Sequence, residues 1–145
     1  MHIGFCFIYP KEWSIATESL GAVAIFLSQK ESESDGFQEN VSIGLQDLEN
    51  NEFKTLDQYV DSNIRGLEKF VTNYELVETK DLVISNIPAK QIIYTGDQGI
   101  YRIKFLQTYF IKDNVAYIIS YTADQEKFDK YLKLAENVIT SFQPL

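Results

Sequence analysis

The feature that most constrains the fold is a stretch from Glu75 to Tyr121, in which apolar and polar residues alternate and short turn sequences interrupt the alternation. A period of two is typical of strands that bury one face. The interruptions are Asn86-Ile87-Pro88, Gly96-Asp97-Gln98-Gly99 and Asp113-Asn114. Because strands joined by tight turns run antiparallel, the stretch predicts four neighbouring antiparallel strands. They cover residues 75–85, 89–95, 100–112 and 115–121.

Two amphipathic segments with helical periodicity flank these strands. Apolar residues recur along one stripe at 56–71 and again at 123–142, which predicts two helices. Each helix opens with Thr-x-Asp-Gln, at 55–58 and 122–125, where the threonine is the expected N-cap and the glutamine stands at the capping-box position. Glycine costs stability inside a helix, so we expect Gly66 to mark a close approach of the first helix to the sheet.

The amino-terminal third predicts further strands. Alternating or continuous apolar runs occupy 3–9, 22–27 and 41–46, and a short strand follows Trp13. Residues 28–40 form a polar loop in this interpretation. The order of elements predicts an α+β fold, a twisted antiparallel sheet of about six or seven strands with helices packed on it, as a single domain over 1–145.

The net charge of −8 narrows the range of partners. Such a chain is repelled by nucleic-acid phosphates and by anionic lipid, so a basic protein partner fits better. No apolar run approaches the length of a membrane span. The chain reads directly into a strand after Met1, which suggests an exported or membrane-peripheral protein in its mature form, its leader, anchor or preceding domain removed.

The sequence offers little for catalysis. Its only histidine, His2, lies near the chain end, and its only cysteine, Cys6, lies in an apolar run where we expect a buried thiol. No nucleophile and base stand in a known catalytic pattern, so the sequence predicts no enzyme and no cofactor. The aromatic faces of the strands are expected to be core beneath the helices, with a ligand pocket between sheet and helix as the alternative.

Two acidic clusters are the candidate partner-binding residues. Loops carry binding sites more often than their share, and carboxylates steer basic partners. The same oxygens suit calcium, but the glycine and the closing glutamate of an EF-hand are missing, so a solvated acidic surface is the expectation. The candidates are Glu31, Glu33 and Asp35 in the first cluster and Asp47, Glu49 and Glu52 in the second.

Several segments together resemble the PsbP-like family. They are the aromatic strand, proline and tryptophan of 5–13, the Asn-Val-Ser-Ile of 40–43, the Ile-Pro-Ala of 87–89, the strand end of 117–123 and the Ser-Phe of 141–142. The resemblance covers nearly the whole chain. It implies a PsbP-like α/β/α sandwich around a central antiparallel sheet, in which Trp13 is structural.

The resemblance also implies a function. Members are non-enzymatic extrinsic proteins that dock on a protein partner, such as photosystem II in the thylakoid lumen or another membrane-associated complex. The same fold occurs in cell-envelope or periplasmic lipoproteins, which suggests a small-ligand carrier, and in a cytosolic GTPase-binding adaptor; both stay open. The basic character and metal-binding histidines of the plant protein have no counterpart here beyond His2, so no metal site is carried over.

Overall fold

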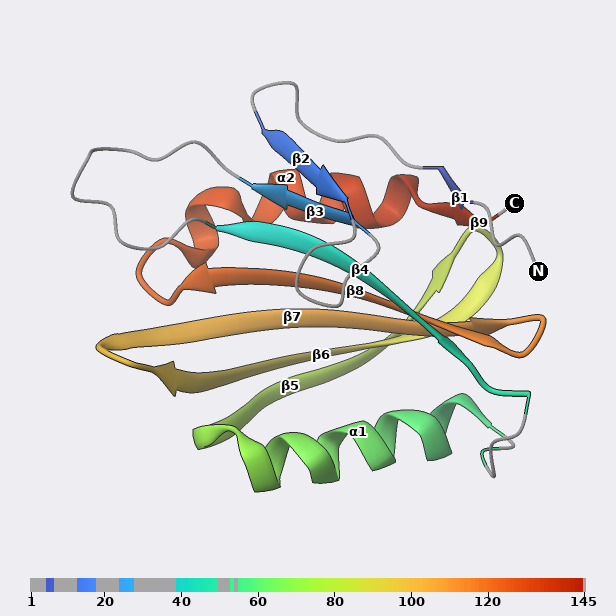
Figure 1. The fold of residues 1–145 in the computed structure, drawn as a ribbon, viewed down its shortest axis with the longest axis horizontal. Helices are drawn as coiled ribbons and strands as arrows, with labels where there is room; N and C mark the ends of the chain where they lie inside the picture. The colour runs from blue at the N-terminus through green and yellow to red at the C-terminus, as the bar shows by residue number, and fades with distance from the viewer. Residues whose placement is uncertain are drawn as a thin grey trace.

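Figure 1 shows the fold in a computed structural model, which describes residues 5–6, 13–17, 24–27, 39–49, 53 and 55–144. The strands and helices follow the predicted order of strands, helix, four-strand meander and helix. Their bounds are β1 Phe5–Cys6, β2 Ser14–Thr17, β3 Ala24–Leu27, β4 Asn40–Asp47, α1 Leu56–Phe70, β5 Thr72–Ile84, β6 Ile87–Gln98, β7 Tyr101–Lys112, β8 Val115–Asp124, α2 Phe128–Ser141 and β9 Gln143–Pro144.

The main sheet is antiparallel throughout and has the order β2-β3-β4-β8-β7-β6-β5. Five long strands, β4 to β8, make up most of it, and the four-residue strands β2 and β3 extend one edge. The meander β5 to β8 pairs as predicted, whereas β4 joins it through a long-range ladder that places Val41 opposite Tyr121. The predicted α+β fold with an antiparallel sheet is confirmed.

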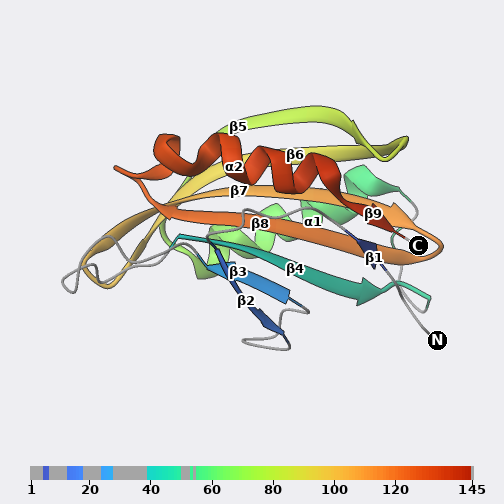
Figure 2. The ribbon, with the colours of Figure 1, turned by 90° about the horizontal axis from the view of Figure 1, so that it is seen from above.

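The helices cover opposite faces of this sheet, as the two views in Figures 1 and 2 show. Side chains alternate between the faces. On the α2 face Phe110 stacks on Tyr117 with ring centroids 4.8 Å apart, and Phe142 of the segment after α2 packs edge-on against both. On the α1 face Tyr94 stacks on Phe105 at 4.5 Å. The aromatic strand faces therefore form core under both helices, and Trp13 joins the α2-side core.

Helix α1 begins where the sequence predicts. The Thr55 hydroxyl accepts a hydrogen bond from the backbone N–H of Gln58 at 3.1 Å, which confirms the N-cap. The prediction for Gly66 is wrong, because a Cβ at that position would meet no atom within 4 Å. The close approach between α1 and the sheet occurs instead at Gly96 of β6, where a Cβ would overlap the Cγ1 of Val71.

The predicted start of the last helix is also wrong. Strand β8 continues to Asp124, which pairs with Ile103, and α2 begins only at Phe128. Thr122 is therefore a strand residue and not an N-cap. The turn is organised by Asp124, whose Oδ1 accepts from the backbone N–H of Glu126 at 3.0 Å. Strand β8 is hydrogen-bonded to β4 on one side and β7 on the other, and this pairing overrides a local capping pattern.

Two turn positions differ by a few residues from those predicted. Strand β6 starts at Ile87 and runs on to Gln98, so the turns are Ser85–Asn86 and Gly99–Ile100. The Asp113–Asn114 turn is confirmed, with φ of 51° and 62°. Each turn contains at least one residue with positive φ, as tight hairpins require.

The first strand is shorter in the described residues than predicted. Strand β1 pairs with β9, which places Cys6 opposite Gln143 in a two-residue ladder. Cys6 is exposed and its thiol lies 3.8 Å from the Gln143 Oε1, so the expectation of a buried thiol is wrong. The reason is that this ladder lies outside the main sheet and its two core clusters.

Candidate docking surface at the end of the β6–β7 hairpin

The acidic residues singled out in the sequence fall into two groups. Glu31, Glu33, Asp35 and Glu52 lie outside the described residues, as does His2. Asp47 and Glu49 are exposed at the end of β4, beside the β7–β8 turn. The Asp47 Oδ1 accepts the backbone N–H of Glu49 at 2.9 Å, so this carboxylate shapes the chain as well as carrying charge. Among the described residues, no three or more His, Cys, Asp or Glu side chains are grouped for a metal ion.

The opposite end of the sheet is built around Arg102. Its guanidinium donates to the Asp97 Oδ1 at 3.0 Å, the Glu75 Oε2 at 3.2 Å and the Thr95 Oγ1 at 2.7 Å. It also donates to the backbone carbonyl of Asn73 at 2.8 Å. One side chain of β7 thus ties the start of β5 to β6. Because these four acceptors occupy the guanidinium, Arg102 braces the hairpin and is not an open site for an anion.

Asp97 completes this brace. The amide of Asn73, a residue held at φ 52°, donates to the Asp97 Oδ2 at 2.6 Å. This hydrogen bond and those from Arg102 hold the pKa of Asp97 below its usual range. The backbone carbonyl of Arg102 in turn accepts from the N–H of Gln125 at 2.9 Å, which joins the hairpin to the β8–α2 turn. The base of the hairpin is therefore cross-linked to the start of β5 and to the β8–α2 turn.

The tip of this hairpin carries an exposed apolar side chain. Gly99 adopts φ 60°, which a two-residue turn between Gln98 and Tyr101 requires. Ile100 follows it and is 91% exposed. Two hollows of about 480 and 560 Å³ lie beside the tip, on either side of Arg102. An isoleucine held at a braced tip loses little conformational entropy on binding, which suits it to act as an anchor.

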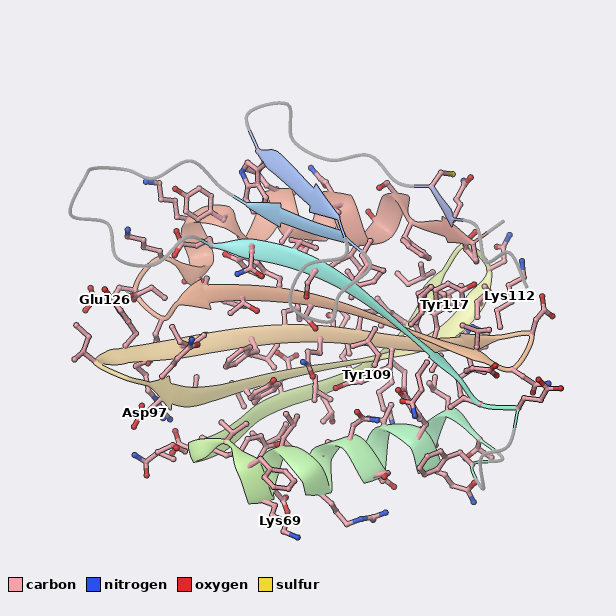
Figure 3. The ribbon with its side chains drawn as sticks, viewed as in Figure 1. Lys69, Asp97, Tyr109, Lys112, Tyr117 and Glu126 are labelled. Carbon is pink, nitrogen blue, oxygen red and sulfur yellow. The ribbon has the colours of Figure 1, made fainter. Side chains whose placement is uncertain are left out.

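The surroundings of the tip are acidic. The residues that line the two hollows include the four carboxylates of Glu75, Asp97, Asp124 and Glu126 against the single guanidinium of Arg102, a net charge of −3. In Figure 3, Asp97 and Glu126 lie at this end and Lys112 lies toward the other. Strand β7 separates this end from Asp47 by roughly 35 Å, at about 3.3 Å per residue. We call Ile100 with these four carboxylates the hairpin-end surface.

Sequence reasoning missed the hairpin-end surface. The single available signal was Ile100, an apolar residue directly after the predicted turn, which the sequence pattern places in the predicted strand 100–112. The carboxylates come from three separate segments, and the pairing of β6 with β7 and of β7 with β8 is needed to bring them together.

The buried phenols take no part in this surface. Burial raises the pKa of Tyr94, of Tyr109 and of Tyr121 well above the ordinary value of a phenol. All three are neutral at physiological pH, and the hydroxyls of Tyr109 and Tyr121 donate hydrogen bonds. The Tyr121 hydroxyl, for example, donates to the backbone carbonyl of Phe128 at 2.7 Å and fixes the start of α2.

Comparison with known proteins places this fold in a family. A family model for PsbP-like proteins matches residues 1–143. The chain belongs to the PsbP-like family. The predicted resemblance is thus confirmed over nearly the whole chain. A search of the curated proteins found no match.

Solved structures share the PsbP-like fold at low sequence identity. LpqN of Mycobacterium tuberculosis, described as involved in cell envelope biogenesis, has a TM-score of 0.75 at 10% identity and covers 99% of this chain and 84% of its own. The cyanobacterial PsbP, CyanoP, of Synechocystis sp. PCC 6803 has a TM-score of 0.66 at 15% identity, with coverages of 98% and 87%. PA94 of Pseudomonas aeruginosa has a TM-score of 0.73 at 13% identity, with coverages of 100% and 99%.

At these identities the structural similarity supports the fold alone and gives no evidence about an activity. Within the part of the chain that the structure describes, no helix is long and apolar enough to cross a membrane.

Proposed function

We propose that this PsbP-like protein is a non-enzymatic, exported accessory protein that docks on a membrane-associated complex through the hairpin-end surface. The observation that carries the proposal is Ile100, a large apolar side chain 91% exposed at the tip of a braced hairpin. Single exposed apolar side chains are common on protein surfaces, and Ile100 differs from them in standing at a braced tip among carboxylates. Apolar anchors that become buried dominate binding energy at interfaces.

The charge around Ile100 specifies the partner. With four carboxylates against one engaged guanidinium, the hairpin-end surface attracts a basic protein surface that has an apolar recess for the isoleucine. Exposed rim charges act mainly on the association rate and are screened by salt. Binding is therefore expected to be faster at low ionic strength. The acidic clusters at 31–35 and 47–52 stay candidates for a second contact.

The compartment is proposed from the fold neighbours. LpqN is described as a protein of cell envelope biogenesis, and CyanoP is a cyanobacterial PsbP. Both point to an exported protein in the cell envelope, periplasm or thylakoid lumen. A photosystem II complex is the candidate partner that CyanoP suggests, and an envelope complex is the one that LpqN suggests. The proposed docking needs no calcium.

The test compares two variants that each remove an exposed apolar side chain. Ile100→Ser alters the hairpin-end surface, and the matched control Val83→Ser alters a 65%-exposed valine near the β5–β6 turn, at the other end of the sheet. Binding to solubilised membrane complexes of the source organism is measured by surface plasmon resonance at low and high salt. We expect Ile100→Ser to weaken binding about tenfold or more, which corresponds to about 1.4 kcal/mol, and Val83→Ser to leave it unchanged.

Two results would contradict this proposal. Equal binding by wild type and Ile100→Ser would show that the hairpin tip is not the anchor. Association that does not depend on salt would show that the carboxylates do not steer the partner. Binding to a soluble GTPase and to no membrane complex would favour the cytosolic adaptor alternative instead.

A further inference from the structure

A third hollow lies on the α1 face of the protein. It has a volume of about 380 Å³ and is lined by residues of α1 together with Gln46 of β4 and the ring of Phe53. Tyr59 lies at its base, only 1% exposed, and Phe70 at the end of α1 is 79% exposed. Ligand pockets usually have volumes of about 300–1,000 Å³, so this hollow has the size of a site for a small ligand. We call it the α1 groove.

The lining of the α1 groove holds no charged side chain. It consists of aromatic rings, the amides of Gln46 and Asn63, the hydroxyl of Ser62, one leucine and one glycine. This lining differs from that of the two hollows beside the β6–β7 tip, which carry four carboxylates and a guanidinium. The lining itself holds no counter-ion for a charged ligand, and an ion loses more hydration on entering than a neutral ligand does.

Polar groups in the α1 groove are available to a ligand. The phenol of Tyr59 donates to the Gln46 Oε1 at 2.7 Å, which orients that amide. Burial raises the pKa of Tyr59, so its hydroxyl stays a neutral donor. Among the described residues, neither the amide nitrogen of Gln46 nor the hydroxyl of Ser62 makes a hydrogen bond. These groups match a ligand that carries several hydroxyls.

Aromatic rings supply the apolar side of the same site. Phe53 packs edge-on against Tyr59 with centroids 5.5 Å apart, and the exposed ring of Phe70 lies at the other end of the groove lining. Lys69 stands at the rim, its Nζ 5.5 Å from the Phe70 centroid. Aromatic faces pack on the C–H faces of sugar rings, so rings combined with amides and a hydroxyl suit a ligand with both kinds of surface.

Gly66 keeps the α1 groove open. It is in the lining, and a Cβ built on it would meet no atom within 4 Å. The glycine costs helix stability without permitting any close packing, which is unusual inside a helix. A larger residue there would fill the space in front of Ser62 and Leu67, its neighbours along the helix.

We propose that the α1 groove binds an uncharged glycoside. The ring of the sugar would lie against the aromatic side chains, and its hydroxyls would bond to Gln46 and Ser62. This site is separate from the hairpin-end surface, so it does not depend on the proposed docking function.

The test is a titration followed by two-dimensional NMR of the backbone amides. The probes are methyl- and octyl-β-glucoside, the latter as monomer, with glucuronic acid as a sugar of the same ring carrying a carboxylate. We expect the neutral glycosides to bind with a Kd of about 1 mM or tighter and to shift the amide signals of Gln46, Ser62 and Gly66. Glucuronic acid is expected to bind at least about tenfold more weakly.

Matched variants connect the binding to the groove. Gly66→Leu fills it, while Arg65→Leu places the same side chain on α1 one residue earlier, outside the lining. Gly66→Leu is expected to abolish the shifts, Arg65→Leu to preserve them, and Ser62→Ala to weaken binding several-fold. Circular dichroism verifies that each variant is folded.

Several outcomes would overturn the proposal. They are the absence of shifts with both neutral glycosides at about 10 mM, equal binding of glucuronic acid, and binding that survives Gly66→Leu. Binding of octyl-β-glucoside without any binding of methyl-β-glucoside would show that the groove takes alkyl chains and not sugars.

Discussion

Two glycines of this protein are expected to respond in opposite ways to the same substitution. Gly66 lies inside α1, where a Cβ meets open space, and alanine has a higher helix propensity than glycine. Gly66→Ala is therefore expected to raise the free energy of unfolding by about 0.5–1 kcal/mol. For a domain of this size that gain corresponds to a rise in Tm of about 2–3 °C.

Gly96 has the opposite environment. It is buried in β6 opposite Ile103, and a Cβ there would overlap Val71 Cγ1 and lie 3.5 Å from the Thr72 carbonyl oxygen. A β-branched side chain has little rotamer freedom, so relief requires movement of the backbone after α1. Gly96→Ala is expected to cost about 1–3 kcal/mol, or about 3–10 °C in Tm.

Urea unfolding and thermal denaturation of the two variants, each followed by circular dichroism, measure these differences. Each variant is the control for the other, because the change in covalent structure is identical. Loss of stability in Gly66→Ala would refute the open space over α1. Unchanged stability in Gly96→Ala would refute the close contact between Val71 and β6.

Two further predictions concern the core and acid stability. Phe128 is 2% exposed and packs on Tyr121, so Phe128→Ala is expected to cost about 3–5 kcal/mol in urea unfolding, whereas Leu132→Ala, at a half-buried position, should cost about 1–2 kcal/mol. Equal losses of stability in the two variants would mean that α2 packs on the sheet with a different face from the one described. The lowered pKa of Asp97 stabilises the fold above the ordinary carboxyl pKa, and this contribution is lost as pH falls through the folded-state value. Asp97→Asn should thus flatten the dependence of stability on pH between about pH 5 and pH 2, and an unchanged slope would contradict the brace.

The strands that could be predicted are those in which the spacing of apolar residues in the sequence matches the face that the folded protein buries. In β7 the residues Phe105, Tyr109 and Ile111 share the face under α1, so their period of two is visible in the sequence, while Leu106 and Phe110 fill the face under α2. Thr55 was predictable for a similar reason, since its cap involves only the next turn of the chain. Such features depend on neighbours within a few residues.

The features that could not be predicted depend on residues far apart in the sequence. Thr122 to Gln125 repeats the pattern of a helix cap, but the ladder with Ile103 and Lys104 keeps β8 extended. The sequence places Gly66 at a close approach and Gly96 in a turn, and the three-dimensional contacts show the close approach at Gly96 instead. The hairpin-end surface likewise depends on carboxylates from β5, β6 and the β8–α2 turn.

The pairing of β4 with β8 has a consequence for how the protein is made. Val41 of β4 pairs with Tyr121 of β8, which lies about 80 residues later in the chain, so β4 leaves the ribosome before β8. At a translation rate of about 5–20 residues per second, the delay between the two strands is roughly 4–16 s. During that time the backbone of β4 lacks the hydrogen bonds that it later makes with β8. Strands β5 to β8 contact their sequence neighbours and close quickly, so the meander is the template onto which β4 docks last. The sequence separation between β4 and β8 therefore sets how long β4 stays without its partner strand in a newly made chain.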